Sequence, residues 1–225
     1  MHYFIKGAVR WLPCDKEYLM IILEDMGQKE GKHTTKNQWF YENGIDVMRV
    51  PLPVGDYIIA NDKVIDVLER KKARGNKPRK IDFSGAYAKA VDTKENMGEI
   101  VSNLCSSESH DRFRDECVLA RNMGVQLYVL VENKDGITCL EDVKEWHNPR
   151  LDIYVRDTDN LIGYYRNGMP KFGRKRKYPT ATKGTSLFKT MHTMQEKYGV
   201  RFMFCHPDEA GATVVGLLEG IKDDG

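Results

Sequence analysis

The chain has 225 residues, of which 41% are hydrophobic and 30% are charged, and its formal net charge is +2. This composition is typical of a globular protein with one domain, or one domain and a small appendage. A net charge so close to zero gives no global sign of nucleic-acid binding, so local clusters of charge have to be examined. The five cysteines form no C-x-x-C pair, which argues against a zinc knuckle and a disulfide scaffold. Without a signal-peptide pattern or a long apolar run, we expect a cytoplasmic protein.

Apolar runs separated by segments with helical spacing alternate along the chain. Such runs predict buried strands, and helical spacing that ends at Gly or Asn-Gly predicts helices. Strands that alternate with helices predict an α/β fold with a mixed sheet flanked by helices. The expected strands are residues 18–25, 45–50, 56–60, 63–69, 88–93, 127–132 and 201–205. The expected helices are residues 34–43, 99–105, 110–123, 186–198 and 208–220.

Two polar segments interrupt this alternation. Residues 70–80 (RKKARGNKPRK) carry seven basic side chains, and we expect a solvated loop there. Residues 150–184 are polar, contain Gly and Pro, and include the basic run 171–177. We interpret them as an extended or mobile excursion. The expected organisation is a main domain over 1–150, the excursion over 151–184, and a C-terminal α/β segment over 185–225 that packs on the main domain.

Acidic residues lie at the ends of several expected strands. Asp25, with Glu24 beside it, ends the first strand, Asp56 begins the third, and Asp92 precedes Lys94 by two residues. A lysine two residues after an acid points to the same side of a strand. Carboxylates that hold a divalent metal ion, together with a nearby positive charge, are what phosphodiester hydrolysis requires. This D…D-x-K pattern therefore predicts a metal-dependent nuclease site.

A second acid-x-Lys triplet, Glu69-Arg70-Lys71, competes with the first. Glu69 follows Asp56 by 13 residues (69 − 56), whereas Asp92 follows it by 36 (92 − 56). A simple hairpin favours the shorter spacing. Lys71 also opens the basic run, however, which favours a solvated loop. From spacing alone, both triplets stay open.

Five short motifs follow one another along the chain: residues 52–57 (LPVGDY), 91–94 (VDTK), 103–105 (NLC), 112–117 (RFRDEC) and 127–133 (LYVLVEN). They resemble motifs of the XPF-type structure-specific endonucleases, and most closely those of compact phage and mobile-element members. The similarity extends over about residues 18–150, with a further familiar segment at 197–212. It implies a restriction-endonuclease-like fold, a Mg²⁺ or Mn²⁺ cofactor, cleavage of branched or single-strand-containing DNA, and a possible homodimer.

The resemblance also implies roles for the acidic residues. In the family, a helix follows the catalytic strand. When the motifs are aligned with those of the family, this helix follows Asp92, so residues 62–88 become an insertion and Glu69 falls outside the site. Asp56 and Asp92 become metal ligands, and Lys94 orients water or stabilises charge in the transition state. The chain departs from its eukaryotic relatives at Asp92, because those relatives have Glu at this position of the acid-x-Lys motif.

Two interpretations stay open for each of the remaining candidate residues. Asp25 is the expected third acid and metal ligand, with Glu24 as the alternative, although the arginine common after this position in relatives is absent. Glu116 is either a further ligand or a surface carboxylate paired with Arg112 or Arg121. His33 is interpreted as a solvated loop residue or a proton carrier.

The two basic runs and one helix arginine are the expected DNA contacts, because neutralised phosphates add salt-dependent affinity. Solubilising loops are the alternative for both runs. A catalytically inactive nuclease-fold scaffold is the alternative for the whole protein. The expected contacts are Arg70, Lys71, Lys72, Arg74, Lys77, Arg79, Arg112, Lys171, Arg174, Lys175, Arg176 and Lys177.

Overall fold

The computed structural model describes residues 20–29 and 31–221. Its centre is a sheet built from β1 (Met20–Asp25), β2 (Ile45–Val50), β3 (Tyr57–Ile59), β4 (Lys89–Lys94), β5 (Gln126–Glu132) and β8 (Arg201–Cys205). These six strands lie in the order β2-β1-β3-β4-β5-β8. Residues 18 and 19 of the first expected strand lie outside the described part of the chain.

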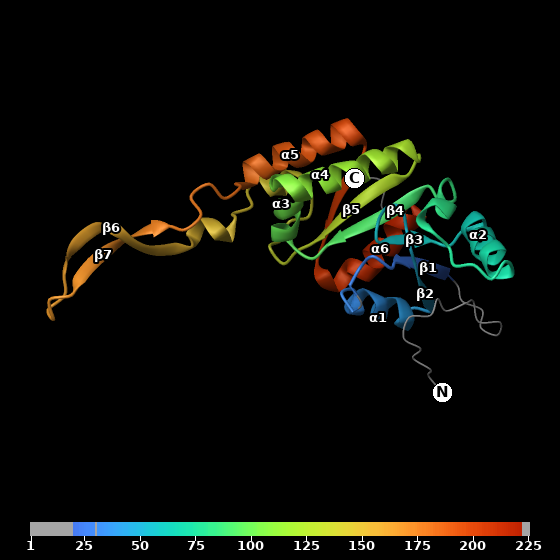
Figure 1. Cartoon of the computed structure of the whole chain (residues 1–225), viewed down its shortest axis with the longest axis horizontal. Helices are drawn as coiled ribbons and strands as arrows, with labels where there is room; N and C mark the ends of the chain where they lie inside the picture. Colours follow the sequence, from blue (N-terminus) through green and yellow to red (C-terminus); the bar gives the residue numbers. More distant parts are fainter. Residues whose placement is uncertain (1–19, 30, 222–225) are drawn as a thin grey trace.

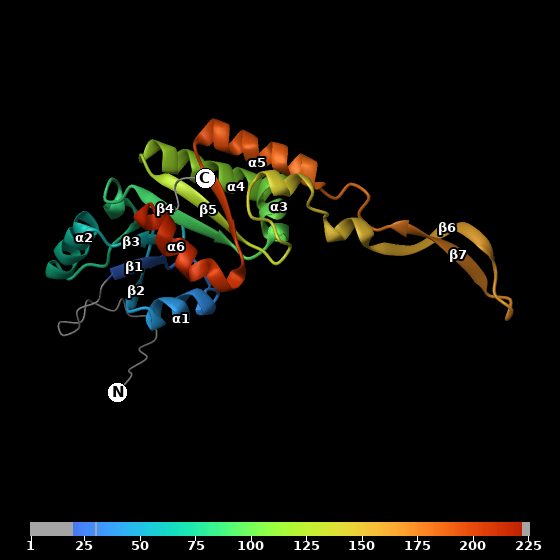
Figure 2. The same ribbon diagram turned by 180° about the vertical axis from the view of Figure 1, so that it is seen from behind.

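Helices cover both faces of this sheet (Figures 1 and 2). The helices are α1 (Thr34–Glu42), α2 (Asp62–Ala73), α3 (Met97–Cys105), α4 (Ser107–Asn122), α5 (Gly184–Tyr198) and α6 (Ala210–Glu219), with short 3-10 turns at Lys80–Phe83, Glu141–Lys144, Pro149–Asp152 and Pro207–Glu209. Helices α3, α4 and α5 pack on one face, and α1 and α6 pack on the other. The predicted α/β class with a mixed, helix-flanked sheet is confirmed. None of the described helices is long and apolar enough to cross a membrane.

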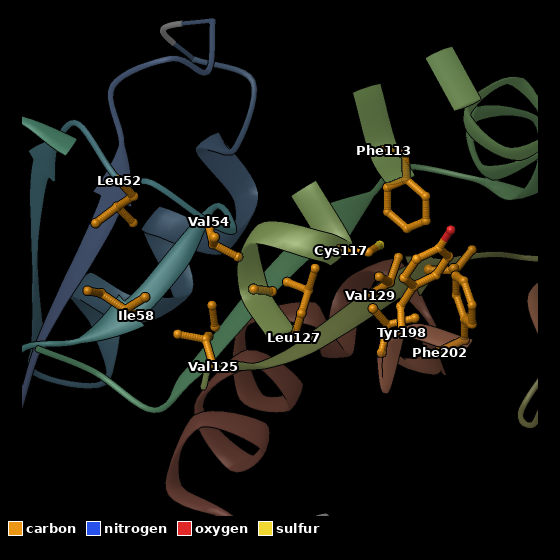
Figure 3. Packing of buried hydrophobic residues seen from close by; sticks show 14 of the residues in the cluster. Leu52, Val54, Ile58, Phe113, Cys117, Val125, Leu127, Val129, Tyr198 and Phe202 are labelled. Carbon is orange, nitrogen blue, oxygen red and sulfur yellow. The ribbon is translucent and has the colours of Figure 1, made fainter. Parts of the chain in front are cut away.

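Strand β5 is apolar on both sides because it is covered on both sides. Leu127 and Val129 belong to the core under α3, α4 and α5, whereas Tyr128 belongs to the core under α1 and α6. Figure 3 shows Phe113 and Cys117 of α4 in the same cluster as Leu127 and Val129. Successive residues of the central strands therefore face different helical layers.

The strand directions bring separate strand ends to one edge of the sheet. β4 and β5 are parallel, as are β5 and β8. β3 runs antiparallel to both β1 and β4. It therefore begins at the edge where β1 and β4 end. Asp25, Asp56 and Lys94 thus come to the same edge, although they are far apart in sequence.

The expectation for residues 63–69 was wrong, because this segment belongs to helix α2 rather than to a strand. The Asn61 side chain caps the helix by accepting a hydrogen bond from the Val64 nitrogen at 3.0 Å. Val64, Val67 and Leu68 are buried at i, i+3 and i+4 spacing. The helix continues to Ala73, so the first part of the expected solvated loop is helical as well.

The polar segment after β5 contains an antiparallel hairpin of β6 (Tyr154–Tyr164) and β7 (Pro170–Arg176). Figures 1 and 2 show this hairpin projecting from the body at the end where α3 and α5 lie. The chain then returns through α5. Its strand β8 joins the main sheet beside β5, and α6 packs against α1.

Candidate active site

A cavity of about 500 Å³ lies at the edge of the sheet where the acidic strand ends meet. The structure brings the sequence-predicted residues Asp25, Asp56, Asp92, Lys94 and Glu116 together in its lining. Arg112, an expected DNA contact, lines it as well. The acids come from three strand ends and one helix, and tertiary packing alone could unite them.

Asp92 and Lys94 project from β4 toward the layer of α3 and α4. The two-residue period of the strand puts them on the same face as the core residue Ala90. The Lys94 ammonium donates to Asp92 Oδ1 at 2.9 Å and lies 2.6 Å from Oδ2. Asp92 Oδ2 nevertheless makes no directed hydrogen bond. The pairing of Asp92 Oδ2 with Lys94 is therefore an ion pair without hydrogen-bond geometry.

Hydrogen bonds from Gln28 and Thr93 hold the carboxylate of Asp56. Its Oδ2 accepts hydrogen bonds from the Thr93 nitrogen at 2.9 Å and the Thr93 hydroxyl at 2.8 Å. Its Oδ1 accepts a hydrogen bond from Gln28 Nε2. Asp56 is only 2% exposed. These bonds fix the carboxylate in one orientation, and neither Gln28 nor Thr93 was expected in this role.

Of the two acids at the end of β1, Asp25 faces the cavity. Asp25 Oδ1 accepts a hydrogen bond from the Leu52 nitrogen at 2.9 Å. Glu24 points to the opposite face of the sheet, where it accepts from Asn37 Nδ2 at 3.0 Å and lies 3.7 Å from Arg49 Nε. Adjacent residues of a strand face opposite sides. The geometry therefore puts Asp25, and not Glu24, in the cavity.

His33 is buried, so the interpretation as a solvated loop residue was wrong. It is 2% exposed and stands immediately before α1. Its Nδ1 lies 3.3 Å from Glu24 Oε1, and its Nε2 lies 3.4 Å from the Thr93 hydroxyl. His33 thus belongs to a polar cluster behind the cavity, and it reaches Asp56 through Thr93.

Glu116 turns inward from α4. Its Oε1 accepts a hydrogen bond from the Gly55 nitrogen at 2.9 Å, and its carboxylate lines the cavity. Arg121, one of its possible surface partners, instead donates to the backbone oxygen of Lys197 at 3.0 Å. Glu116 thus lies with the strand-end acids rather than in a surface ion pair.

The cavity lining has an excess of negative charge. Five acidic and three basic side chains line it, which gives a formal charge of −2 when all are ionised. Burial, together with the charges of Asp56 and Glu116, raises the pKa of Asp92 to about 8, although Lys94 opposes the shift. Burial also raises the pKa of Glu116. Burial alone would lower the pKa of Lys94, but the surrounding carboxylates raise it.

This donor set fits a divalent cation. Mg²⁺ and Mn²⁺ prefer carboxylate oxygens, and here burial and the nearby charge of Asp56 raise the pKa of both Asp92 and Glu116. Within residues 20–29 and 31–221, no three acidic, His or Cys side chains are already gathered as a metal cluster. In this arrangement Lys94 contacts Asp92, and Gln28 and Thr93 bind Asp56.

The competing triplet lies elsewhere. Glu69 is exposed on α2, and Lys71 forms an ion pair with Asp82 at 2.7 Å. Arg79 also lies near Asp82, at 3.7 Å. From the first basic run, the residue that lines the cavity is Lys80, which ends that run but was not singled out among the expected contacts.

The two basic runs are far apart in space. Helix α2 and the hairpin lie at opposite ends of the described structure (Figures 1 and 2). The first run belongs to α2 and the turn after it, and the second belongs to β7 and the residue that follows. They therefore do not form one continuous basic surface.

No family model matches the sequence, and no curated protein matches it. Among solved structures, the chain is similar to XPF from Aeropyrum pernix, with 14% identity and a TM-score of 0.46. It is also similar to the same protein in complex with DNA, with 14% identity and a TM-score of 0.48. Each similarity covers 91% of this chain and 66% of that chain, so this chain spans just under two thirds of their length. At this sequence identity and TM-score, the similarity carries no evidence of function, and the chain's own side chains have to supply it.

Proposed function

We propose that the protein is a metal-dependent endonuclease that hydrolyses phosphodiester bonds of DNA. The observation that carries this proposal is the meeting of Asp56, Asp92 and Glu116 with Lys94 in one cavity at the edge of the sheet. Burial raises the pKa values of the Asp92 and Glu116 carboxylates, and such groups next to a lysine are typical of sites that bind a cation and act on a charged substrate.

Asp56 and Asp92 would hold Mg²⁺ or Mn²⁺, with Glu116 or Asp25 as a further ligand. The metal ion supplies an activated water and neutralises charge on the phosphate when it is bound. Thr93 and Gln28 orient Asp56 through their hydrogen bonds. Such bonds to a ligand residue commonly set its orientation and its affinity for metal.

The basic residues of the lining would handle the substrate. Lys94 stays protonated because its carboxylate neighbours raise its pKa, so it can stabilise negative charge that develops on the phosphate. Arg112 and Lys80 also line the cavity, and they can neutralise neighbouring phosphates. Branched or single-strand-containing DNA as the substrate, and a possible homodimer, are what the motif resemblance implies.

Cleavage assays test this proposal. The protein is incubated with labelled flap, fork and Holliday-junction DNA, with Mg²⁺, with Mn²⁺ or with EDTA. We expect metal-dependent products from the wild type, and a loss on the order of 100-fold or more in Asp92→Asn, since one electrostatic contributor to a transition state is often worth that much.

The matched control is Glu69→Gln, which removes the acid of the competing triplet from the exposed side of α2. It should cleave like the wild type. The opposite pattern, with Glu69→Gln inactive and Asp92→Asn active, would move the site to α2. DNA binding by the wild type without products under any metal would support the inactive scaffold instead.

A further inference from the structure

The β6–β7 hairpin has two chemically different faces. Tyr154 pairs with Arg176, and Arg156 pairs with Arg174, across the antiparallel register. Because directly opposed residues lie on the same side of a hairpin, the three arginines share one face. We call Arg156, Arg174 and Arg176 the arginine face. Val155 and Asp157, with Lys175 opposite Val155, lie on the other face.

The arginine face is not neutralised. In the described part of the chain, no carboxylate forms an ion pair with Arg156, Arg174 or Arg176. All three side chains are exposed. Arg156 and Arg174 stand directly opposite each other, an arrangement in which like charges destabilise a hairpin. A bound polyanion would remove this repulsion.

Aromatic rings contact two of these arginines, Arg156 and Arg176. The Arg156 guanidinium carbon lies 4.1 Å from the centre of the Phe172 ring. The Arg176 guanidinium carbon lies 6.0 Å from the centre of the Tyr154 ring, and its Nε donates to the Tyr154 hydroxyl at 3.3 Å. Arg156 Nη2 also donates to the Pro170 oxygen at 3.5 Å. The remaining outer N–H groups of a guanidinium over a ring stay available for anions. The half-buried Phe172 ring is covered by Arg156, so this ring is not open for stacking on unpaired bases.

On the opposite face, one lysine is neutralised internally. Lys175 forms ion pairs with Asp157 at 3.0 Å and with Asp159 at 3.5 Å. Of the basic residues in this run, Lys175 is therefore the one whose charge already has carboxylate partners. The hairpin thus has one side with three arginines that form no ion pair with described residues, and another side on which Lys175 is paired and Lys171 is exposed.

The chain leaves the sheet at the edge that carries the cavity before it forms the hairpin. β4 and β5 are parallel, with Lys94 opposite Val131, so the end of β5 lies at the same edge as the end of β4. The chain leaves β5 at this edge and proceeds to the hairpin, which projects away from the body (Figure 1). A ligand that crosses the cavity could thus continue along the projecting hairpin.

We propose that the arginine face of the β6–β7 hairpin binds the phosphate backbone of duplex DNA beside the cleavage site. A two-stranded β-ribbon has the dimensions of the major groove, and arginine forms paired hydrogen bonds with phosphate. The choice of DNA as the polyanion rests on the proposed function. Arg156, which stands outside the basic run of the sequence, is part of this surface.

The test is a binding measurement in EDTA, where cleavage does not interfere. A labelled blunt duplex is titrated with wild type and with the triple variant Arg156→Gln/Arg174→Gln/Arg176→Gln, and fluorescence anisotropy is recorded over a range of salt concentrations. We expect the variant to bind at least ten times more weakly. Its slope of log affinity against log salt should fall by up to about 2.7, at about 0.9 for each phosphate that the variant no longer neutralises.

The matched control is Lys171→Gln/Lys175→Gln/Lys177→Gln, which removes the same number of charges from the same hairpin. It should bind the duplex several times more tightly than the arginine variant. Circular dichroism and thermal unfolding check that both variants keep the fold. Equal weakening in both variants, or none in the arginine variant, would overturn the proposal.

Two further measurements separate this proposal from others. If the arginine variant binds duplex DNA normally but changes the oligomeric state in light scattering, the face serves a protein contact and the proposal is wrong. Cleavage by the wild type is scored independently. Arginine-dependent binding without cleavage would contradict the nuclease function alone, and cleavage with unchanged binding in the variant would contradict the DNA-binding hairpin alone.

Discussion

The carboxylate of Glu116 on α4 accepts a hydrogen bond from the backbone nitrogen of Gly55 at 2.9 Å. This bond connects the helix to the turn that carries Asp56, so the side chain has two separable properties. It accepts a hydrogen bond, and it adds negative charge to a cavity that already contains Asp56 and Asp92.

Substitution of Glu116 separates these properties. Glu116→Gln keeps an acceptor for the Gly55 nitrogen but removes the charge. We expect cleavage to fall by roughly 10- to 100-fold, as is usual when a group that supports a metal ion is removed, while stability stays within about 0.5 kcal/mol. Glu116→Ala should also reduce stability by about 1 kcal/mol, because it removes the acceptor for the Gly55 nitrogen. Single-turnover rates and urea unfolding measure the two effects. Full activity in Glu116→Gln would limit this residue to a structural role.

Gly55 itself should tolerate no side chain. Its φ is +74°, and a Cβ at this position would lie 2.8 Å from Ala90 Cβ. Gly55→Ala should cost about 2 kcal/mol or more, because backbone strain and overpacking add together. The control is Gly75→Ala, which has a φ of +66° but no atom within 4 Å of the new Cβ. It should cost about 1 kcal/mol from strain alone. Equal midpoints in urea unfolding would refute the close contact with β4.

Thr93 should matter through Asp56. Its hydroxyl donates to Asp56 Oδ2 at 2.8 Å, and both groups are buried. Thr93→Val keeps the shape but removes the donor, so we expect a decrease of about 1–2 kcal/mol in stability and weaker binding of Mn²⁺. Thr93→Ser retains the hydroxyl and should bind Mn²⁺ nearly as the wild type does. Calorimetric titration with Mn²⁺ makes the comparison, and equal affinities in all three proteins would show that this bond does not position Asp56.

The metal-free protein should become less stable as the pH rises. Burial raises the pKa of Asp92 from 3.8 to about 8, so between these values the folded protein holds a proton that the unfolded chain has released. Stability falls with pH wherever the folded state binds more protons. The stability of the wild type in EDTA should therefore decrease from pH 4 to pH 8, within the window set by these two values.

The control for this prediction is Asp92→Asn, which cannot titrate at this position. Its stability should decrease less over the same pH range, as measured by chemical denaturation at each pH. Mn²⁺ should restore the stability of the wild type at the upper end of the range, because a bound cation favours the ionised carboxylate. Parallel pH profiles for the two proteins would mean that Asp92 is not the group with the raised pKa.

Much of the fold could be predicted because its strands are short apolar runs between recognisable stop signals. One exception is the polar stretch that forms β6 and β7, where no strand was expected. A second is the segment that contains Val64 and Leu68. A continuous apolar run of this length fits a buried strand as well as a buried helix. The capping bond from Val64 to Asn61 and the burial of one side of α2 decided the matter. Both depend on how the segment packs.

The sequence by itself determined that Asp92 and Lys94 share a side of their strand, because side chains alternate with a period of two residues. It also placed acids at the ends of other strands. Only the tertiary structure decided that Asp25 rather than Glu24 enters the cavity, and that Glu116 and Lys80 join it. Those residues belong to elements far apart in the chain. The antiparallel insertion of β3 between β1 and β4, and the packing of α4 over that edge, bring them within reach of one another.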